Sequence, residues 1–201
     1  MRTPSNRWLG GLALLSFVIH GGGHVLRGTA HDVLWACTVA NLLIAFGLLL
    51  PLRREQAATL CAIAVLWLCV GNFTWALDLI FGGEFFITSL LTHWLGLILG
   101  LLSLRRLGWP QRAWLHATLS LIALQIISRL LTPAAANVNV AHSVYASYSR
   151  IYPSYPWFWL ASFAQTTAAY FVIDRILRRL LGRPTPQPAE IAPQPAVSPR
   201  R

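Results

Sequence analysis

The chain has 201 residues, of which 56% are hydrophobic and only 11% are charged, with 9 Trp. This composition is too apolar for a soluble domain of this size and is typical of an integral membrane protein. The formal net charge of +10 comes from arginine alone. A nucleic-acid-binding protein would need a folded basic face outside the membrane, and no segment of the sequence is long and polar enough to carry one, so no nucleic-acid partner is expected.

Six apolar stretches follow one another along the chain, each close to the ~20 residues that cross a bilayer. They cover residues 8–26, 33–52, 57–80, 85–104, 113–131 and 157–177. None has the two-residue alternation of a barrel strand. The predicted fold is therefore an all-α, polytopic membrane bundle of about six transmembrane helices over residues 1–182. As an alternative, the first stretch is a cleaved signal peptide, which would leave five spans.

The arginines indicate the orientation of these stretches. Assigning the connecting segments alternately to two sides places 13 Arg on one side and only Arg27, Arg129 and Arg150 on the other. By the positive-inside rule both termini are cytoplasmic, and the expected location is the inner membrane of a bacterium, as a multi-pass protein. Residues 183–201, with six Pro, are expected to form a disordered cytoplasmic tail.

Polar side chains within the predicted spans are concentrated towards one side. A polar group in hydrocarbon is expensive and should face the bundle interior or a cavity. At a rise of 1.5 Å per residue, each of the six spans places such groups in the outer half of the membrane. We expect them to line a polar cavity whose binding residues are His24, Asn41, Asn72, Gln125, Arg129, Asn137, Asn139 and Gln165. Alternatively, the same groups only form hydrogen bonds between helices.

Histidines and cysteines offer little evidence for a metal site. His20 and His24 flank three glycines and share one helix face, as a metal pair would, and Asp32 follows on the same side. Two histidines without an adjacent carboxylate are a weak signal, and haem ligation lacks a matching histidine pair. The three cysteines all lie inside predicted spans, which argues against disulfides and thiolate clusters. No metal and no other cofactor is expected.

The connection from residue 132 to 156 is long and rich in Tyr, Ser and Asn. A segment of this kind is often a lid or a binding element. It is equally compatible with an interfacial cap, because Tyr and Trp concentrate at the headgroup level.

Four motifs carry a resemblance to known membrane proteins. Asn72-Phe-Thr-Trp75, Thr88-Ser-Leu-Leu-Thr-His93, Arg129-Leu-Leu-Thr-Pro133 and Asn137-Val-Asn139 resemble a family of bacterial six-span proteins with no assigned activity. The layout is more distantly similar to the androgen-induced, lipid-hydrolase type of six-span protein and its acyltransferase relatives. In that type, a Thr or Cys on the second span is the nucleophile and works with a His on the fourth. The resemblance implies Thr38, or the adjacent Cys37, as nucleophile and His93 as base.

Three main classes of function remain open at this point, and a haem-binding redox protein, in which His20 or His24 and His93 would be the axial ligands, is a further alternative. The first is an intramembrane enzyme in which Thr38 and His93 hydrolyse or transfer a lipid acyl group, because a hydroxyl nucleophile needs a base within reach. Arg129, Asn137 or Asn139 would then stabilise an oxyanion or hold a headgroup phosphate. The second is a protein that binds or transports a lipid or small molecule without covalent chemistry. The third is a membrane-complex subunit. Membrane lipids are the expected partners of each.

Overall fold

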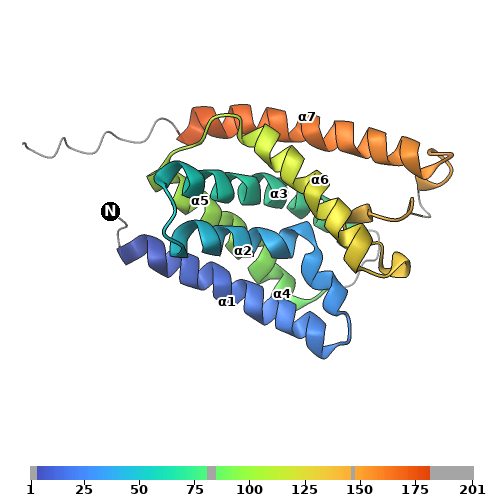
Figure 1. Ribbon diagram of the computed structural model, residues 1–201, viewed down its shortest axis with the longest axis horizontal. Coiled ribbons are helices and arrows are strands. Elements are labelled where there is room, and N and C mark those ends of the chain that lie inside the picture. Colours follow the sequence, from blue (N-terminus) through green and yellow to red (C-terminus); the bar gives the residue numbers. More distant parts are fainter. Residues whose placement is uncertain (1–3, 81–84, 146–147, 182–201) are drawn as a thin grey trace, which may run out of the picture.

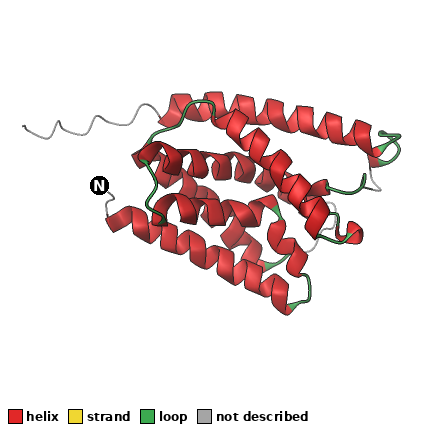
Figure 2. Cartoon of the chain, in the orientation of Figure 1, coloured by secondary structure: helices red, strands yellow, loops and turns green. Residues whose placement is uncertain are grey.

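The computed structural model describes residues 4–80, 85–145 and 148–181, and 83% of them are helical, with no strand among them (Figure 1, Figure 2). The predicted all-α fold is confirmed for this part of the chain, and the predicted tail, 183–201, lies outside it. The α-helices are α1 (Pro4–Leu26), α2 (Ala36–Leu49), α3 (Arg54–Ile80), α4 (Ile87–Leu90), α5 (Gly96–Leu107), α6 (Ala113–Leu131) and α7 (Tyr155–Leu181). A π-turn, η2 (Leu91–Leu95), joins α4 to α5 as one continuous helix. The short 3-10 helices are η1 (Ala30–Leu34), η3 (Ala134–Ala136) and η4 (Val138–Val140).

Within the described residues, four helices are long and apolar enough to cross a membrane: Asn6–Leu26, Arg54–Ile80, Ile87–Leu107 and Ala113–Leu131. They correspond to the first, third, fourth and fifth predicted stretches. The second stretch, 33–52, contains a helix of only 14 residues, because Trp35 and Leu50 leave the helical conformation on either side of it. The sixth lies within α7, which has 27 residues but also carries polar and charged side chains that keep it out of this class.

Helix α3 is the centre of the bundle. Every residue from Cys61 to Leu68 is buried, as expected for a helix that is apolar all round. It packs against α2, α5, α6 and α7, while α1 packs against α2. Trp67 of α3 donates from Nε1 to the carbonyl of Ala117 in α6 at 3.0 Å. In Figure 1, α1 and α7 consequently lie on opposite sides of this centre.

Two glycines let α5 approach its neighbours closely. A Cβ atom on Gly96 would lie 2.6 Å from Asn41 Oδ1, and one on Gly100 would lie 2.5 Å from Val65 Cγ2. Both distances are too short for a real Cβ, so the backbone of α5 itself contacts α2 and α3, as small residues allow in membrane bundles. This approach places Asn41 next to the π-turn.

Arginines hold the end of the bundle where α1 begins and α7 ends, which we call the arginine end (Figure 1). Arg54 donates from Nε to the Leu107 carbonyl at 3.0 Å, which caps the C-terminus of α5 and complements its dipole. Asp174 of α7 is 2% exposed; it accepts from Trp109 Nε1 at 2.7 Å and pairs with Arg178 at 3.2 Å. These contacts tie α7 to the turn between α5 and α6.

Candidate functional site

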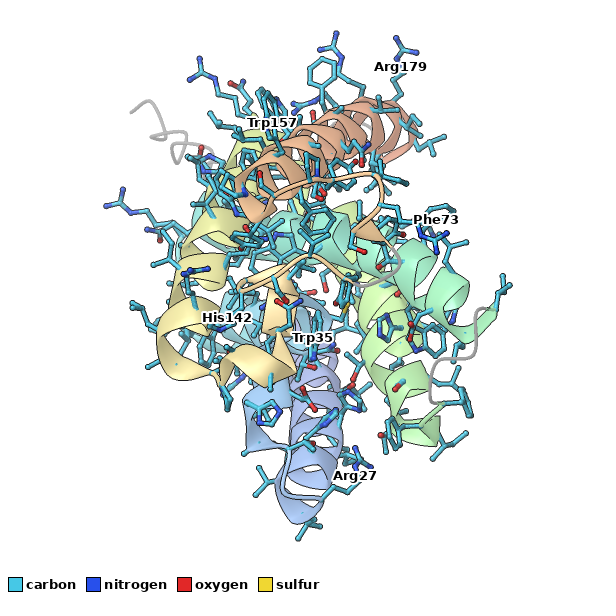
Figure 3. All side chains as sticks on the ribbon, turned by 90° about the vertical axis from the view of Figure 1, so that its right-hand side faces the viewer. Arg27, Trp35, Phe73, His142, Trp157 and Arg179 are labelled. Atoms are coloured by element: carbon cyan, nitrogen blue, oxygen red, sulfur yellow. The ribbon has the colours of Figure 1, made fainter. Side chains whose placement is uncertain are left out.

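The opposite end of the bundle, which we call the loop end, carries the connections 27–35 and 132–154. Figure 3 looks onto this end and shows Trp35 near the middle of the face, with His142 to its left. Buried polar side chains meet here from α1, α2, α3, the α4–η2–α5 helix, α6 and the connection after α6. They form three groups.

The first group surrounds the π-turn. In an α-helix the amide of Gly96 would bond to the carbonyl of Thr92, but here it bonds to those of Leu91 and His93. The Thr92 carbonyl instead accepts a hydrogen bond from Asn41 Nδ2 of α2, at 3.0 Å. A side chain from a neighbouring helix thus replaces the backbone bond that the π-turn removes.

Asn72 of α3 holds His93 at two points. Its Nδ2 donates to the His93 carbonyl at 3.2 Å, and its Oδ1 lies 2.8 Å from His93 Nδ1. Because the amide nitrogen must face the carbonyl, the amide oxygen faces Nδ1, which therefore carries a proton. The imidazole also stacks on Trp75, with ring centroids 4.7 Å apart. His93 is fixed in this tautomer, and its Nε2 has no hydrogen bond within the described ranges.

The second group is a chain of four side chains that runs from α4 to η1. Thr88 Oγ1 lies 2.9 Å from His20 Nδ1, and His20 Nε2 lies 3.3 Å from His24 Nε2. His24 Nδ1 in turn lies 3.4 Å from Asp32 Oδ2. Both histidines are buried, at 6% and 9% exposure. Three successive contacts therefore connect the Thr88 hydroxyl to a carboxylate.

Asp32 determines where the hydrogens of this chain lie. We assign the proton of His24 to Nδ1, because the Asp32 carboxylate 3.4 Å away can only accept. The Thr29 oxygen, 3.0 Å from Nδ1, then also accepts, and its hydroxyl donates to the His24 carbonyl at 3.3 Å. His24 Nε2 is then the acceptor for the Nε2 proton of His20, and His20 Nδ1 is left to accept the Thr88 proton. Thr88 is thus hydrogen-bonded to an unprotonated ring nitrogen, which is the relation of a nucleophile to its general base.

A positive charge and an apolar surface flank Thr88. The guanidinium carbon of Arg27 lies 4.1 Å from the ring centroid of Phe86, two residues before Thr88. The neighbouring Ile87 is 69% exposed and Leu90 is 38% exposed. Thr88 itself is half-buried.

The third group is centred on Asn139, in the connection after α6. Its Nδ2 donates to the Leu34 carbonyl at 2.7 Å and to Ser128 Oγ at 2.9 Å, and its Oδ1 accepts from the amide of Ala36 at 2.9 Å. Ala36 is the first residue of α2, so Asn139 supplies an N-terminal cap to a helix that lies 103 residues earlier in the sequence.

A left-handed backbone turns this connection back onto the bundle. The φ angles of Asn137 and Asn139 are 44° and 53°, a region that Asn tolerates better than most residues. Asn137 Oδ1 accepts from the amides of His142 and Ser143 at 2.9 and 3.0 Å. Both asparagines therefore bond mainly to the chain's own backbone, which identifies the connection as a cap on the bundle.

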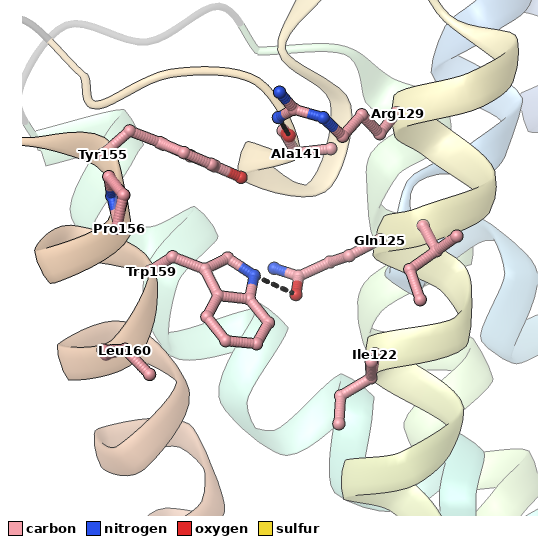
Figure 4. Close-up of a pocket in the computed structure, with 9 residues that line it drawn as sticks. Ile122, Gln125, Arg129, Ala141, Tyr155, Pro156, Trp159 and Leu160 are labelled. Atoms are coloured by element: carbon pink, nitrogen blue, oxygen red, sulfur yellow. Dashed lines mark hydrogen bonds between the residues drawn. The ribbon is translucent and has the colours of Figure 1, made fainter.

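A groove lies between α6 and α7 beside this connection (Figure 4) and has a volume of about 460 Å³. Gln125 accepts at Oε1 from Trp159 Nε1 at 3.1 Å and donates from Nε2 to the Asn139 carbonyl at 3.0 Å. Arg129 donates from Nη1 to the Ala141 carbonyl at 2.7 Å. These bonds fix the polar end of the groove to the connection after α6.

Eight of the ten residues predicted for the site belong to these three groups or to the polar end of the groove, and two do not. Gln165 is exposed on α7 and belongs to none of these groups. Thr38 is 1% exposed, and within the described ranges no hydrogen bond joins its hydroxyl to His93. The structure thus gathers most of the predicted polar residues at one end but does not couple the predicted nucleophile to the predicted base.

Sequence reasoning missed the coupling of Thr88 to His20. The spacing of His20 and His24 was a usable signal, since side chains four residues apart meet on one helix face. The sequence gives no sign that Thr88 is the partner of His20, because their contact depends on how α1 packs beside α4. The stacking of Trp75 on His93 had a weak signal, since Trp75 lies one helical turn after Asn72.

Comparison of the chain with protein-family models, with curated protein sequences and with solved structures gives no match.

Substitutions at Asn139 separate its side chain from its backbone conformation. Asn139→Gly keeps the left-handed φ but removes the side-chain hydrogen bonds, and should lower the free energy of unfolding by about 2–4 kcal/mol, at ~1 kcal/mol per bond plus the cost of unpaired partners. Asn139→Ala should cost about 1 kcal/mol more, because Ala is strained at positive φ. Chemical denaturation in detergent measures both. The exposed Gln165→Ala is the control and should stay within about 0.5 kcal/mol of wild type; a wild-type value for Asn139→Gly would contradict the capping role.

Proposed function

We propose that this protein is a membrane-embedded enzyme that hydrolyses or transfers the acyl group of an ester-linked lipid, with Thr88 as nucleophile and His20 as general base. The observation that carries the proposal is the 2.9 Å contact between Thr88 Oγ1 and His20 Nδ1, continued through His24 to Asp32. A threonine hydroxyl is a weak nucleophile unless a base accepts its proton and a further group orients that base.

The proposed setting is a bacterial inner membrane crossed six times, with both termini in the cytoplasm. The four apolar helices support it, as do α2 and α7, which run alongside them in Figure 1. The beginning of α1 and the end of α7 share the arginine end (Figure 1), which agrees with the excess of arginine on one predicted side. This placement puts Thr88 in the outer leaflet, within reach of lipid ester groups.

The proposed reaction begins when Thr88 Oγ1 bonds to the ester carbonyl carbon and its proton passes to His20 Nδ1. The tetrahedral intermediate then collapses, the bond to the lipid alcohol breaks, and the alcohol leaves with the proton from His20. Water attacks the Thr88 acyl ester with His20 again as the base, which releases the fatty acid and restores the hydroxyl. One ester and one water yield one acid and one alcohol; a second alcohol in place of water would make the reaction an acyl transfer.

Two further groups have supporting roles in this scheme. When His20 becomes an imidazolium, its Nε2 proton points at His24, and Asp32 stabilises the positive charge through His24, as the carboxylate of a catalytic triad does. Arg27, whose guanidinium lies over the Phe86 ring two residues before Thr88, is the proposed stabiliser of the oxyanion.

The resemblance to the androgen-induced lipid hydrolases assigns the same type of reaction to Thr38 and His93. We favour Thr88 and His20 because their reacting atoms are in contact, whereas the Thr38 hydroxyl has no hydrogen bond to His93 in the described residues. A non-catalytic lipid-binding protein is the alternative that a lack of turnover would support.

Cysteine labelling tests the orientation. In a variant whose three native cysteines are replaced by Ala, Ala135→Cys in the exposed η3 should react with a membrane-impermeant maleimide in intact cells, because the loop end is placed outside. Gln111→Cys, exposed at the arginine end, should react only after permeabilisation. The reverse pattern would overturn the proposed topology.

Acyl release tests the nucleophile. In nanodiscs containing a diacyl phospholipid, Thr88→Ala should abolish fatty-acid release, and His20→Gln should lower it about 100- to 10,000-fold, the usual contribution of a general base. The double variant should be scarcely slower than Thr88→Ala, because nucleophile and base act as a unit. Thr74→Ala, exposed on α3, is the matched control and should keep the wild-type rate.

The same assay separates the competing assignments. Loss of release in Thr38→Ala and His93→Ala, with retention in Thr88→Ala, would transfer the reaction to the pair that the resemblance implies. No release by folded wild-type protein with any ester-linked lipid would refute the enzymatic proposal.

A further inference from the structure

The groove between α6 and α7 combines an apolar wall with a single cationic end. Ile122 and Ile126 line it from α6, and Leu160 lines it from α7. Arg129 and Tyr155 close it at the loop end, and Figure 4 shows Trp159 reaching across it towards Gln125. Its volume of about 460 Å³ is in the range of small-molecule sites.

The cationic end is held in place before any ligand arrives. Arg129 donates to the Ala141 carbonyl at 2.7 Å, and its guanidinium carbon lies 5.6 Å from the ring centroid of Tyr155. The Tyr155 hydroxyl donates to the Val140 carbonyl at 3.0 Å. Among the described residues, one guanidinium N–H group of Arg129 bonds the Ala141 carbonyl and another faces the Tyr155 hydroxyl. Since a guanidinium has five N–H groups, donors are left for an anion.

The geometry of α6 matches the shape of a lipid. Arg129, Ile126 and Ile122 follow one another at intervals of three and four residues, so they form a stripe along one helix face. At 1.5 Å per residue the stripe runs about 10 Å from the charged end towards the middle of the bundle. A guanidinium recognises phosphate oxygens in pairs, and an acyl chain matches the apolar wall that follows it.

We propose that this groove binds one phospholipid, with its phosphate on Arg129 and an acyl chain along Ile126 and Ile122. The inference uses the membrane placement proposed above but not the acyl-transfer reaction, because Thr88 and His20 belong to α4 and α1, which do not line the groove. The bound lipid would stabilise the contact between α6, α7 and the connection after α6.

Native mass spectrometry of the full chain with added dioleoyl phosphatidylglycerol tests the phosphate contact. Arg129→Gln should weaken binding of this lipid about 10- to 100-fold, the loss expected for a charged hydrogen-bonded contact. Arg150→Gln, an exposed arginine at the same end, removes the same charge and should bind as wild type does. Dioleoylglycerol, which lacks the phosphate, should bind wild type as weakly as the phospholipid binds Arg129→Gln. Equal weakening by the two arginine variants would overturn the site.

Filling the groove tests the chain contact without touching Arg129. Ile126→Trp should weaken phospholipid binding at least tenfold, because the indole would occupy the groove. Leu119→Trp is the control and should bind the phospholipid as wild type does. Leu119 lies on the same face of α6, two turns from Ile126, and both side chains are 55% exposed. Inorganic phosphate should fail to displace the lipid at equal concentration; displacement would show a free-anion site instead. Unchanged binding in a folded Ile126→Trp variant would likewise refute the proposal.

Discussion

Buried backbone groups that lose their helical partners must find others, and in this bundle asparagine side chains from distant segments supply them. The π-turn withdraws the Gly96 amide from the Thr92 carbonyl, and Asn41 takes its place. The start of α2 exposes the Ala36 amide, and Asn139 accepts from it. In surroundings without water an unpaired carbonyl or amide costs on the order of 1–3 kcal/mol, so these bonds determine which helices can lie side by side.

The consequence is a bundle with two chemically different ends. At the arginine end, guanidinium groups cap helix termini and pair with the buried Asp174. At the loop end, the hydroxyl, imidazole and amide groups of several helices are brought together around the interrupted helices. The proposed nucleophile and base lie here because α1 ends, and α4 begins, at the same level of the bundle. The asparagines that stabilise the bundle and the proposed catalytic side chains therefore lie at the same end.

Much of the fold follows from hydropathy along the sequence, whereas the coupling of side chains does not. The predicted stretch 113–131 and the helix α6 begin and end at the same residues. The length of the apolar segment was enough to predict this helix. The short α2 was not predictable, since its start depends on Asn139, more than a hundred residues later. The collection of polar residues at one end was predictable from their depth. Which hydroxyl meets which histidine was not, because the contact of Thr88 with His20 depends on the packing of α1 beside α4.

The central claim is that His20 presents an unprotonated Nδ1 to Thr88. Nitrogen-15 magnetic resonance of imidazole-labelled protein in lipid bilayers measures this directly, with the signals of His20 and His24 assigned by single substitution. The account predicts a neutral His20 that carries its proton on Nε2, next to a His24 that carries its proton on Nδ1. A proton on Nδ1 of His20 would contradict it, because that ring would donate to the Thr88 hydroxyl and would be unable to accept its proton.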